Sequence, residues 1–288
     1  MRQTLLLTIC FGMFIEFSIA SFAAGAEEVS EKDLFGDDNL VAWCIVPFDA
    51  KRRGPAERAE MLVRLGLKRV AYDWREEHVA TFEEEILQYK KHDLEFFAFW
   101  DVHEEALKLF EKYDLHPQIW RIAPTPDVES QEERVATAAK QLLPFVNRAK
   151  QLGCKFGIYN HGGWSGEPEN MIAICKWLHE HAAGEHVGIV YNFHHGHEHI
   201  EDFGTLLSLM KPYLLCLNIN GMNTNANPKI VSIGQGQHER KMLMTVLESG
   251  YAGPIGILDH RVEMDAEESL GQNLQGLKAV VKELDLAE

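Results

Sequence analysis

The amino-acid sequence predicts a (β/α)8 barrel, in which eight parallel strands alternate with eight helices. Three observations indicate this fold. Short apolar, β-prone segments alternate with segments whose apolar residues recur at helical spacing, and this pair occurs eight times. No segment between the pairs has the composition of a linker between domains. Without its N-terminal leader the chain keeps about 260 residues, which is the size of one such barrel.

The leader, residues 1–26, is predicted to be a secretory signal peptide. Arg2 supplies the positive charge, a mostly apolar segment follows, and Ala24-Gly25-Ala26 matches the A-x-A cleavage pattern. We therefore expect cleavage after Ala26, export to the periplasm or the extracellular space, and no attachment to a membrane after cleavage. Residues 27–38 are charged and lack apolar periodicity, so we expect a flexible arm before a single barrel domain over residues 39–288.

Continuous apolar runs mark the strands, as expected when both faces of a sheet are covered. Several runs end abruptly in polar or aromatic residues: Asp73 follows KRVAY, Trp100 and Asp101 follow LEFFAF, and Asn160 and His161 follow KFGIY. In chain order, the strands are predicted at residues 39–47, 68–72, 94–99, 118–122, 155–159, 187–191, 213–217 and 254–258.

Helical spacing of apolar residues marks the segments between the strands. Ser130 and Glu133 form a capping box that fixes the start of the fourth helix, and Pro168 suits the first turn of the fifth. The seventh helix follows Gly234-Gln235-Gly236, which is either an anion-binding turn or a plain turn before a helix. Five helices are predicted with both ends, at residues 55–67, 82–92, 104–113, 130–152 and 266–284. Of the other three, the fifth begins near residue 167, the sixth ends near residue 210, and the seventh begins after residue 236.

The segment VGIVYNFHHGHEHI, residues 187–200, is the most informative stretch of the chain. An apolar strand ends in a cluster of amide and imidazole side chains, either as a merely histidine-rich loop or as part of a site. We favour a site, because the carboxyl ends of all barrel strands meet at one mouth and several carry such groups. The candidate residues there are Asp73, Arg75, Asp101, Arg121, Tyr159, Asn160, His161, Trp164, Asn192, His194, His195, Asn218, Asn220, Asp259 and His260.

The chemistry of these side chains predicts a small carbohydrate as the ligand. Neutral amides and imidazoles suit a molecule with many hydroxyl groups, and aromatic faces suit a sugar ring. Trp74, Trp100 and Trp164 could provide such faces, whereas Trp43 and Trp120 lie within strands and are expected in the core. A net charge of −16 argues against nucleic acid as a partner.

The cysteines are expected to be buried thiols. After loss of the leader, four remain: Cys44, Cys154, Cys175 and Cys216. Each lies in or beside an apolar segment, and free cysteine is among the most buried residue types. Export would permit a disulfide, and Cys154 with Cys175 is the pair on consecutive elements.

Four motifs resemble those of a known family: YNHGG at 159–163, NFHH at 192–195, LNING at 217–221 and SIGQGQ at 232–237. They are similar to the E-N-H-G-G, D-x-x-H, seventh-strand and glycine-pair segments of the xylose-isomerase-like TIM barrels, the sugar-phosphate isomerase/epimerase family. The resemblance covers the whole chain after the leader. It implies one divalent cation, held by glutamate, aspartate, histidine and glutamate on strands five to eight, and proton transfer next to a carbonyl.

The chain departs from this pattern at the metal ligands. The resemblance places Tyr159, Asn192 and Asn218 at the first three ligand positions, so that only Asp259 keeps an acid. Hard cations need anionic oxygen, and we therefore predict no tightly bound Mg²⁺ or Mn²⁺ at the usual site. Because imidazole also binds metals, the alternative is a divalent cofactor such as Zn²⁺ or Mn²⁺.

Three interpretations of the function follow. The first is an exported sugar isomerase, epimerase or lyase acting on a free sugar, keto-sugar or glycoside, with His161, His195 and Asp259 as catalytic residues and the other residues at the mouth binding substrate. The second is a non-catalytic carbohydrate-binding protein on a degenerate barrel. In the third, a transition metal is bound by histidines among those at positions 194, 195, 197 or 199.

Overall fold

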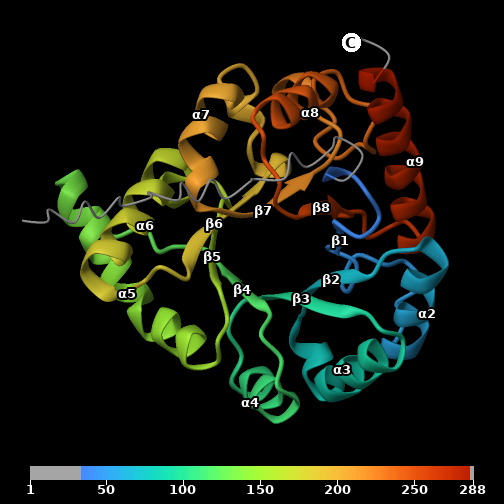
Figure 1. Cartoon of the computed structure of the whole chain (residues 1–288), viewed down its shortest axis with the longest axis horizontal. Helices are drawn as coiled ribbons and strands as arrows, with labels where there is room; N and C mark the ends of the chain where they lie inside the picture. Colours follow the sequence, from blue (N-terminus) through green and yellow to red (C-terminus); the bar gives the residue numbers. More distant parts are fainter. Residues whose placement is uncertain (1–33, 286–288) are drawn as a thin grey trace, which may run out of the picture.

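A closed barrel of eight parallel strands forms the centre of the molecule, and each strand pairs with the next in the chain, with β8 closing on β1 (Figure 1). The computed structural model describes residues 34–285; the predicted signal peptide lies outside them. The predicted fold class is confirmed. The strands are β1 (Leu40–Trp43), β2 (Arg69–Asp73), β3 (Glu95–Trp100), β4 (Gln118–Arg121), β5 (Phe156–Tyr159), β6 (Val187–Asn192), β7 (Leu214–Ile219) and β8 (Ile255–Leu258).

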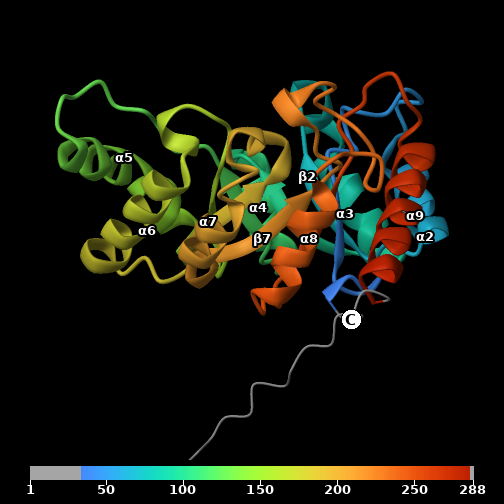
Figure 2. The same cartoon turned by 90° about the horizontal axis from the view of Figure 1, so that it is seen from above.

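Helices form the outer layer around the barrel, as Figures 1 and 2 show from two directions. The helices for which a start was predicted begin close to it, and the helix predicted to extend up to residue 210 ends at Met210. Ser130 accepts a hydrogen bond from the Glu133 amide, and Pro168 opens its helix. The helices are α2 (Pro55–Leu65), α3 (Phe82–Lys91), α4 (Glu104–Tyr113), α5 (Gln131–Gln151), α6 (Pro168–Ala182), α7 (Phe203–Met210), α8 (Glu239–Glu248) and α9 (Ala266–Asp285).

Two apolar clusters stabilise this arrangement. The larger one lies between the strands and the helices, and the smaller one fills the barrel with alternate residues of the strands. Trp120 is fully buried inside the barrel, and Gly157 on β5 makes room for it. A Cβ atom at Gly157 would lie 2.6 Å from a methyl group of Val190 and 3.0 Å from the Trp120 ring.

The first strand is shorter than the nine residues predicted. Cys44 has a φ of 61°, a left-handed conformation that ends the strand after Trp43. The described end of the predicted arm is packed: Leu34 and Phe35 are buried, and the Asn39 side chain donates to the Leu34 carbonyl at 2.8 Å. Leu34 and Phe35 are two adjacent apolar residues in a charged segment. They therefore produced no helical or strand periodicity in the sequence.

The four cysteines within residues 34–285 are all free and buried. No disulfide therefore joins Cys154 to Cys175. In the same described range, no helix combines the length and the apolar character that crossing a membrane requires.

Candidate functional site

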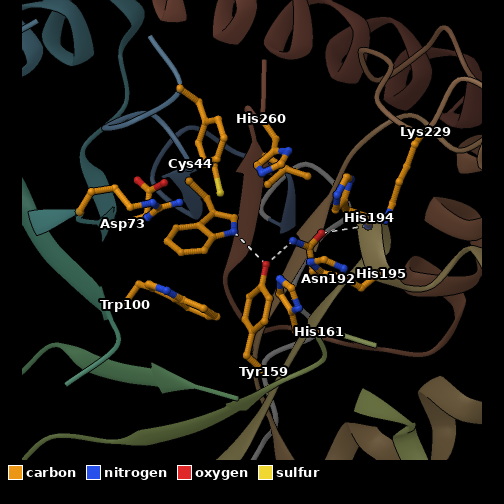
Figure 3. Close-up of a pocket in the computed structure, with 14 residues that line it drawn as sticks. Cys44, Asp73, Trp100, Tyr159, His161, Asn192, His194, His195, Lys229 and His260 are labelled. Atoms are coloured by element: carbon orange, nitrogen blue, oxygen red, sulfur yellow. Dashed lines mark hydrogen bonds between the residues drawn. The ribbon is translucent and has the colours of Figure 1, made fainter. Parts of the chain in front are cut away.

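A cavity of about 300 Å³ opens at the carboxyl ends of the barrel strands (Figure 3). Its wall combines aromatic rings, four histidines, one carboxyl group and two cationic side chains. The lining residues are Trp43, Cys44, Phe48, Asp73, Arg75, Trp100, Tyr159, His161, Asn192, His194, His195, Lys229, Leu258 and His260.

Strand periodicity explains which side chains reach this cavity. Alternate residues of a barrel strand face the interior, so Asp73 shares its face with Ala71, and Asn192 shares its face with Val190. Tyr159 is the last residue of β5 and faces inward in the same way.

Asn160 joins the ends of β5 and β6. Its side-chain oxygen accepts from the Asn192 amide at 2.7 Å, and its side-chain nitrogen donates to the Asn192 carbonyl at 3.1 Å. The Asn192 side chain in turn accepts from the His194 amide at 3.0 Å. These bonds fix the backbone where the histidine-rich segment leaves the strand, which is the reason for a buried amide at each position.

Tyr159 stands at the centre of the wall and is only 3% exposed. Its hydroxyl accepts hydrogen bonds from the Trp43 indole nitrogen, at 3.2 Å, and from the side-chain nitrogen of Asn192 (Figure 3). Burial raises the pKa of the Tyr159 phenol, so the hydroxyl stays protonated at neutral pH.

The histidines form a chain of neighbouring rings. The centroids of His161 and His195 are 4.4 Å apart, those of His195 and His194 are 4.7 Å apart, and those of His194 and His260 are 5.0 Å apart. Burial, to which the neighbouring rings and Lys229 add, lowers the pKa of His194 to about 2 and that of His195 to about 3. Both rings are therefore neutral at physiological pH.

Asp73 lies on the opposite side of the cavity from His161 and His195 (Figure 3). Its carboxylate accepts from the Val46 amide at 3.2 Å, and burial raises its pKa to about 7, although the charge of Arg75 opposes this. The rim carries two exposed cations, Arg75 and Lys229.

Eight of the fifteen predicted site residues line the cavity, and seven do not. Asp101 and Arg121 form an ion pair with each other, and the Arg121 guanidinium lies 4.1 Å from the centroid of the Phe145 ring. Trp164 donates to Gln131 at 2.9 Å outside the cavity. Asn160 joins two strands, as described.

The remaining three residues are buried at the ends of β7 and β8 but are not part of the cavity wall. Asp259 is 0% exposed and accepts a hydrogen bond from Ser269 on α9, with Arg261 at 3.7 Å. The Asn218 side chain accepts from the Cys216 thiol, and the Asn220 side chain donates to the Gly221 carbonyl at 2.7 Å.

The wall also contains residues that were not among the predicted site residues. Trp43 was expected in the core, yet its ring both packs there and lines the cavity. Trp100, which the sequence indicated only as a possible face for a sugar ring, is the last residue of β3 and lines the cavity. Phe48 and Lys229 belong to loops, and nothing in the sequence around them marks them as site residues.

Comparison with known proteins identifies the architecture. No protein-family model matches the chain, and no curated protein matches its sequence. Among solved structures, a 3-keto-D-glucoside 4-epimerase from E. coli superposes with a TM-score of 0.61 at 13% identity, over 85% of this chain and 99% of that one. A D-psicose 3-epimerase, crystallised in the presence of D-fructose, gives 0.61 at 12% identity, over 84% and 99%.

A xylose isomerase domain containing protein from Salmonella typhimurium gives a TM-score of 0.58 at 11% identity, over 85% of this chain and 98% of that one. The chain has the xylose-isomerase-like TIM-barrel fold. The predicted resemblance is thereby confirmed at the level of the fold.

The residues that the sequence resemblance places at the metal-ligand positions do not fit a divalent cation. The Tyr159 hydroxyl and the Asn192 amide are bonded to each other, and the Asn192 oxygen is taken by a backbone amide. Asn218 does not reach the cavity, and Asp259 bonds to α9. Across residues 34–285, no three His, Cys, Asp or Glu side chains are grouped to hold a metal ion.

The histidines of the third interpretation point to separate partners. His197 contacts the His194 carbonyl at 3.1 Å, and His199 pairs with Glu167 at 2.9 Å. Neither joins His194 and His195 at the wall of the cavity.

The glycine-rich turn of this xylose-isomerase-like barrel binds an internal carboxylate. One oxygen of Glu239 accepts from the amides of Gly234 and Gly236, at 3.0 and 2.6 Å, and the other accepts from the Met222 amide at 3.0 Å. Glu239 is 2% exposed. The amides that could have bound an anion are thus already occupied.

Proposed function

We propose that the protein is an exported, sugar-active enzyme of the isomerase, epimerase or lyase type. It acts on an unphosphorylated carbohydrate with a carbonyl group and transfers a proton at the adjacent carbon without a bound metal. The observation that carries this proposal is the pair of His161 and His195, 4.4 Å apart at the cavity wall beside Tyr159. A neutral imidazole can remove a proton, and a second ring next to it can return one.

A carbohydrate suits the composition of the cavity. The rings of Trp100 and Phe48 offer apolar faces, and Asp73, Asn192 and the histidines offer groups that bond to hydroxyls. Two solved structures with the same fold are sugar 4- and 3-epimerases, and their substrates carry a carbonyl group. Both points support the substrate class.

The glycine-rich turn supports an unphosphorylated substrate. A phosphate at this turn would need the backbone amides that already bond to Glu239, and it would meet the charge of that carboxylate. Export, which the leader predicts, also favours a free sugar or a glycoside over a phosphorylated metabolite. Mass spectrometry of the N-terminus of the native protein tests export, since a chain that begins at Met1 would contradict it.

A non-catalytic carbohydrate-binding protein is the second candidate. The low pKa of His195 favours it, because an imidazole with a pKa of about 3 is a weak base.

Solvent exchange separates the two candidates. The purified protein is incubated in D2O with D-fructose, D-psicose and a 3-keto-D-glucoside, and deuterium incorporation next to the carbonyl is followed by NMR. Binding is measured in parallel by calorimetry. Incorporation that is lost in His195→Gln supports the enzyme. Binding without incorporation supports the binding protein, and neither signal with any of the three sugars contradicts both.

A further inference from the structure

We propose that the Tyr159 hydroxyl donates its hydrogen to the substrate carbonyl oxygen and stabilises the enolate, so that Tyr159 is a catalytic residue. This inference rests on the proposed function. It names the group that stabilises the enolate oxygen in place of the cation of the metal-dependent family. It follows from the hydrogen bonds around a single oxygen atom.

Both acceptor positions of the Tyr159 oxygen are filled. A hydroxyl has two lone pairs and one hydrogen. Trp43 and Asn192 each donate an N–H to this oxygen, and an indole nitrogen is a donor only. The hydrogen of Tyr159 therefore has to point away from both, and within residues 34–285 no atom accepts a hydrogen bond from it.

The orientation of the Asn192 amide is fixed by the backbone. Its oxygen accepts from the His194 amide at 3.0 Å, so its nitrogen necessarily faces Tyr159. Reversing the amide would place two donors, the side-chain nitrogen and the His194 N–H, against each other. Tyr159 thus cannot give its hydrogen to Asn192, which acts as a positioning residue.

The open direction for the hydrogen is the cavity beside the histidine pair. The Tyr159 ring lines the cavity, and its centroid is 4.8 Å from that of Trp100 and 5.8 Å from that of His195. His161 and His195 lie on one side of Tyr159, away from Asp73 (Figure 3), so we place the carbon next to a carbonyl bonded to Tyr159 on that side. The acid and the base then act on adjacent substrate atoms.

The proton-transfer step balances with these groups. The neutral imidazole takes the proton of the C–H bond, and the electron pair of that bond forms the C=C bond of the enolate. The carbonyl π electrons move to the oxygen, which accepts the hydrogen bond of Tyr159. Return of a proton from imidazolium to the same face of this carbon regenerates the starting sugar. Delivery of a proton from water to the opposite face gives the epimer, and the imidazolium then loses its proton to water. No oxidant or reductant is needed.

Two substitutions test the donor role in different ways. Tyr159→Phe removes the hydroxyl. Asn192→Asp keeps the hydroxyl but puts an acceptor in place of the N–H donor, so the Tyr159 hydrogen turns toward the new carboxylate and leaves the cavity. Tyr191→Phe is the matched control: Tyr191 is also buried, its hydroxyl is unpaired within the described residues, and it is not part of the cavity wall.

We expect both Tyr159→Phe and Asn192→Asp to lower the exchange rate at saturating sugar about 100-fold or more, the size of a lost oxyanion donor. Binding affinity changes much less, about tenfold at most, since the ground-state bond is between neutral groups. Tyr191→Phe keeps the wild-type rate. Circular dichroism and melting curves confirm that each variant is folded at the assay temperature.

Different failures overturn different statements. If wild type exchanges and either variant keeps its rate, Tyr159 is not the donor, while the proposed function stands. If wild type binds a keto-sugar without exchange, catalysis is overturned, and with it the role of Tyr159. If the variants lose binding and exchange in equal proportion, the hydroxyl contributes only to binding, which also overturns the inference.

Discussion

His161 and His195 belong to different strand ends, yet the centroids of their rings lie 4.4 Å apart. His161 follows β5 and is exposed at the rim, whereas His195 follows β6 and is more buried. Burial, to which His161 adds, lowers the pKa of His195 to about 3, so the His195 ring is neutral at physiological pH. A neutral imidazole can accept a proton from a substrate.

We predict that His195→Gln lowers the exchange rate about 100-fold to 10,000-fold, the usual size of a lost acid or base. His161→Gln lowers it as well, and the double variant loses no more than the worse single variant if the rings act as a unit. NMR exchange rates of the three variants measure this. Additive losses would contradict two rings that act as a unit. His186→Gln is the control, because His186 lies between α6 and β6, far from the cavity.

Buried His194 predicts an acid-sensitive fold. Because its folded pKa is lowered to about 2, below the ordinary 6.5, the folded state binds fewer protons than the unfolded state between these values. This group therefore lowers the free energy of unfolding by about 1.4 kcal/mol per unit as pH falls below 6.5. His194→Asn removes this slope. Urea unfolding at pH 5 and pH 7 measures it, and an unchanged slope would contradict a buried neutral ring.

Asp73 predicts the opposite dependence. Its folded pKa is raised to about 7 from 3.8, so the folded state binds more protons between these values and stability falls as pH rises through them. Asp73→Asn keeps an oxygen for the Val46 amide but cannot ionise. We expect its stability relative to wild type to be greater at pH 8 than at pH 4. An equal difference at both pH values would show that Asp73 is not buried as described.

The sequence predicted the order of the strands and helices well, because each is marked by its own apolar pattern. It predicted the mouth residues less well, since it assigned polar residues to the site because they stand at strand ends, whichever way their side chains point. The alternation of a strand excludes some of them: Leu258 and His260 line the cavity, so Asp259 between them faces α9.

Other features of the site depend on contacts between distant segments, which no local pattern reveals. Asp101 follows β3, Arg121 is the last residue of β4, and the two form an ion pair outside the cavity. The long loop that follows β7 brings Lys229 to the rim. The hydrogen bonds from the backbone amides of the glycine-rich turn to Glu239 likewise depend on the direction of one carboxylate, which the sequence does not show.

Asp259 is expected to matter for stability rather than for exchange. Its carboxylate bonds to Ser269 and lies near Arg261, at a fully buried position. Asp259→Ala should lower the free energy of unfolding by about 1–3 kcal/mol, because it leaves buried polar groups unpaired. The exchange rate per folded molecule should not change. If the variant folds but no longer exchanges deuterium, Asp259 is a catalytic residue and this prediction is wrong.

Glu239 should control the glycine-rich turn. We predict that Glu239→Ala lowers the free energy of unfolding by about 1.5–3 kcal/mol, since three backbone amides lose a charged acceptor. Inorganic phosphate should then raise the melting temperature of this variant more than that of wild type. Glu248→Ala, at the exposed end of the same helix, is the control. Equal phosphate effects would contradict an anion-binding turn that Glu239 occupies.

The most direct test of metal-independent proton transfer is the exchange of a keto-sugar in D2O by protein treated with chelator and passed through a desalting column. A sugar that the untreated protein exchanges serves as substrate, and elemental analysis reports the metal content of each sample. We predict the same exchange rate before chelation, after chelation and after addition of Mn²⁺, with the rate lost in His195→Gln. Exchange that disappears on chelation and returns with Mn²⁺ would contradict the account.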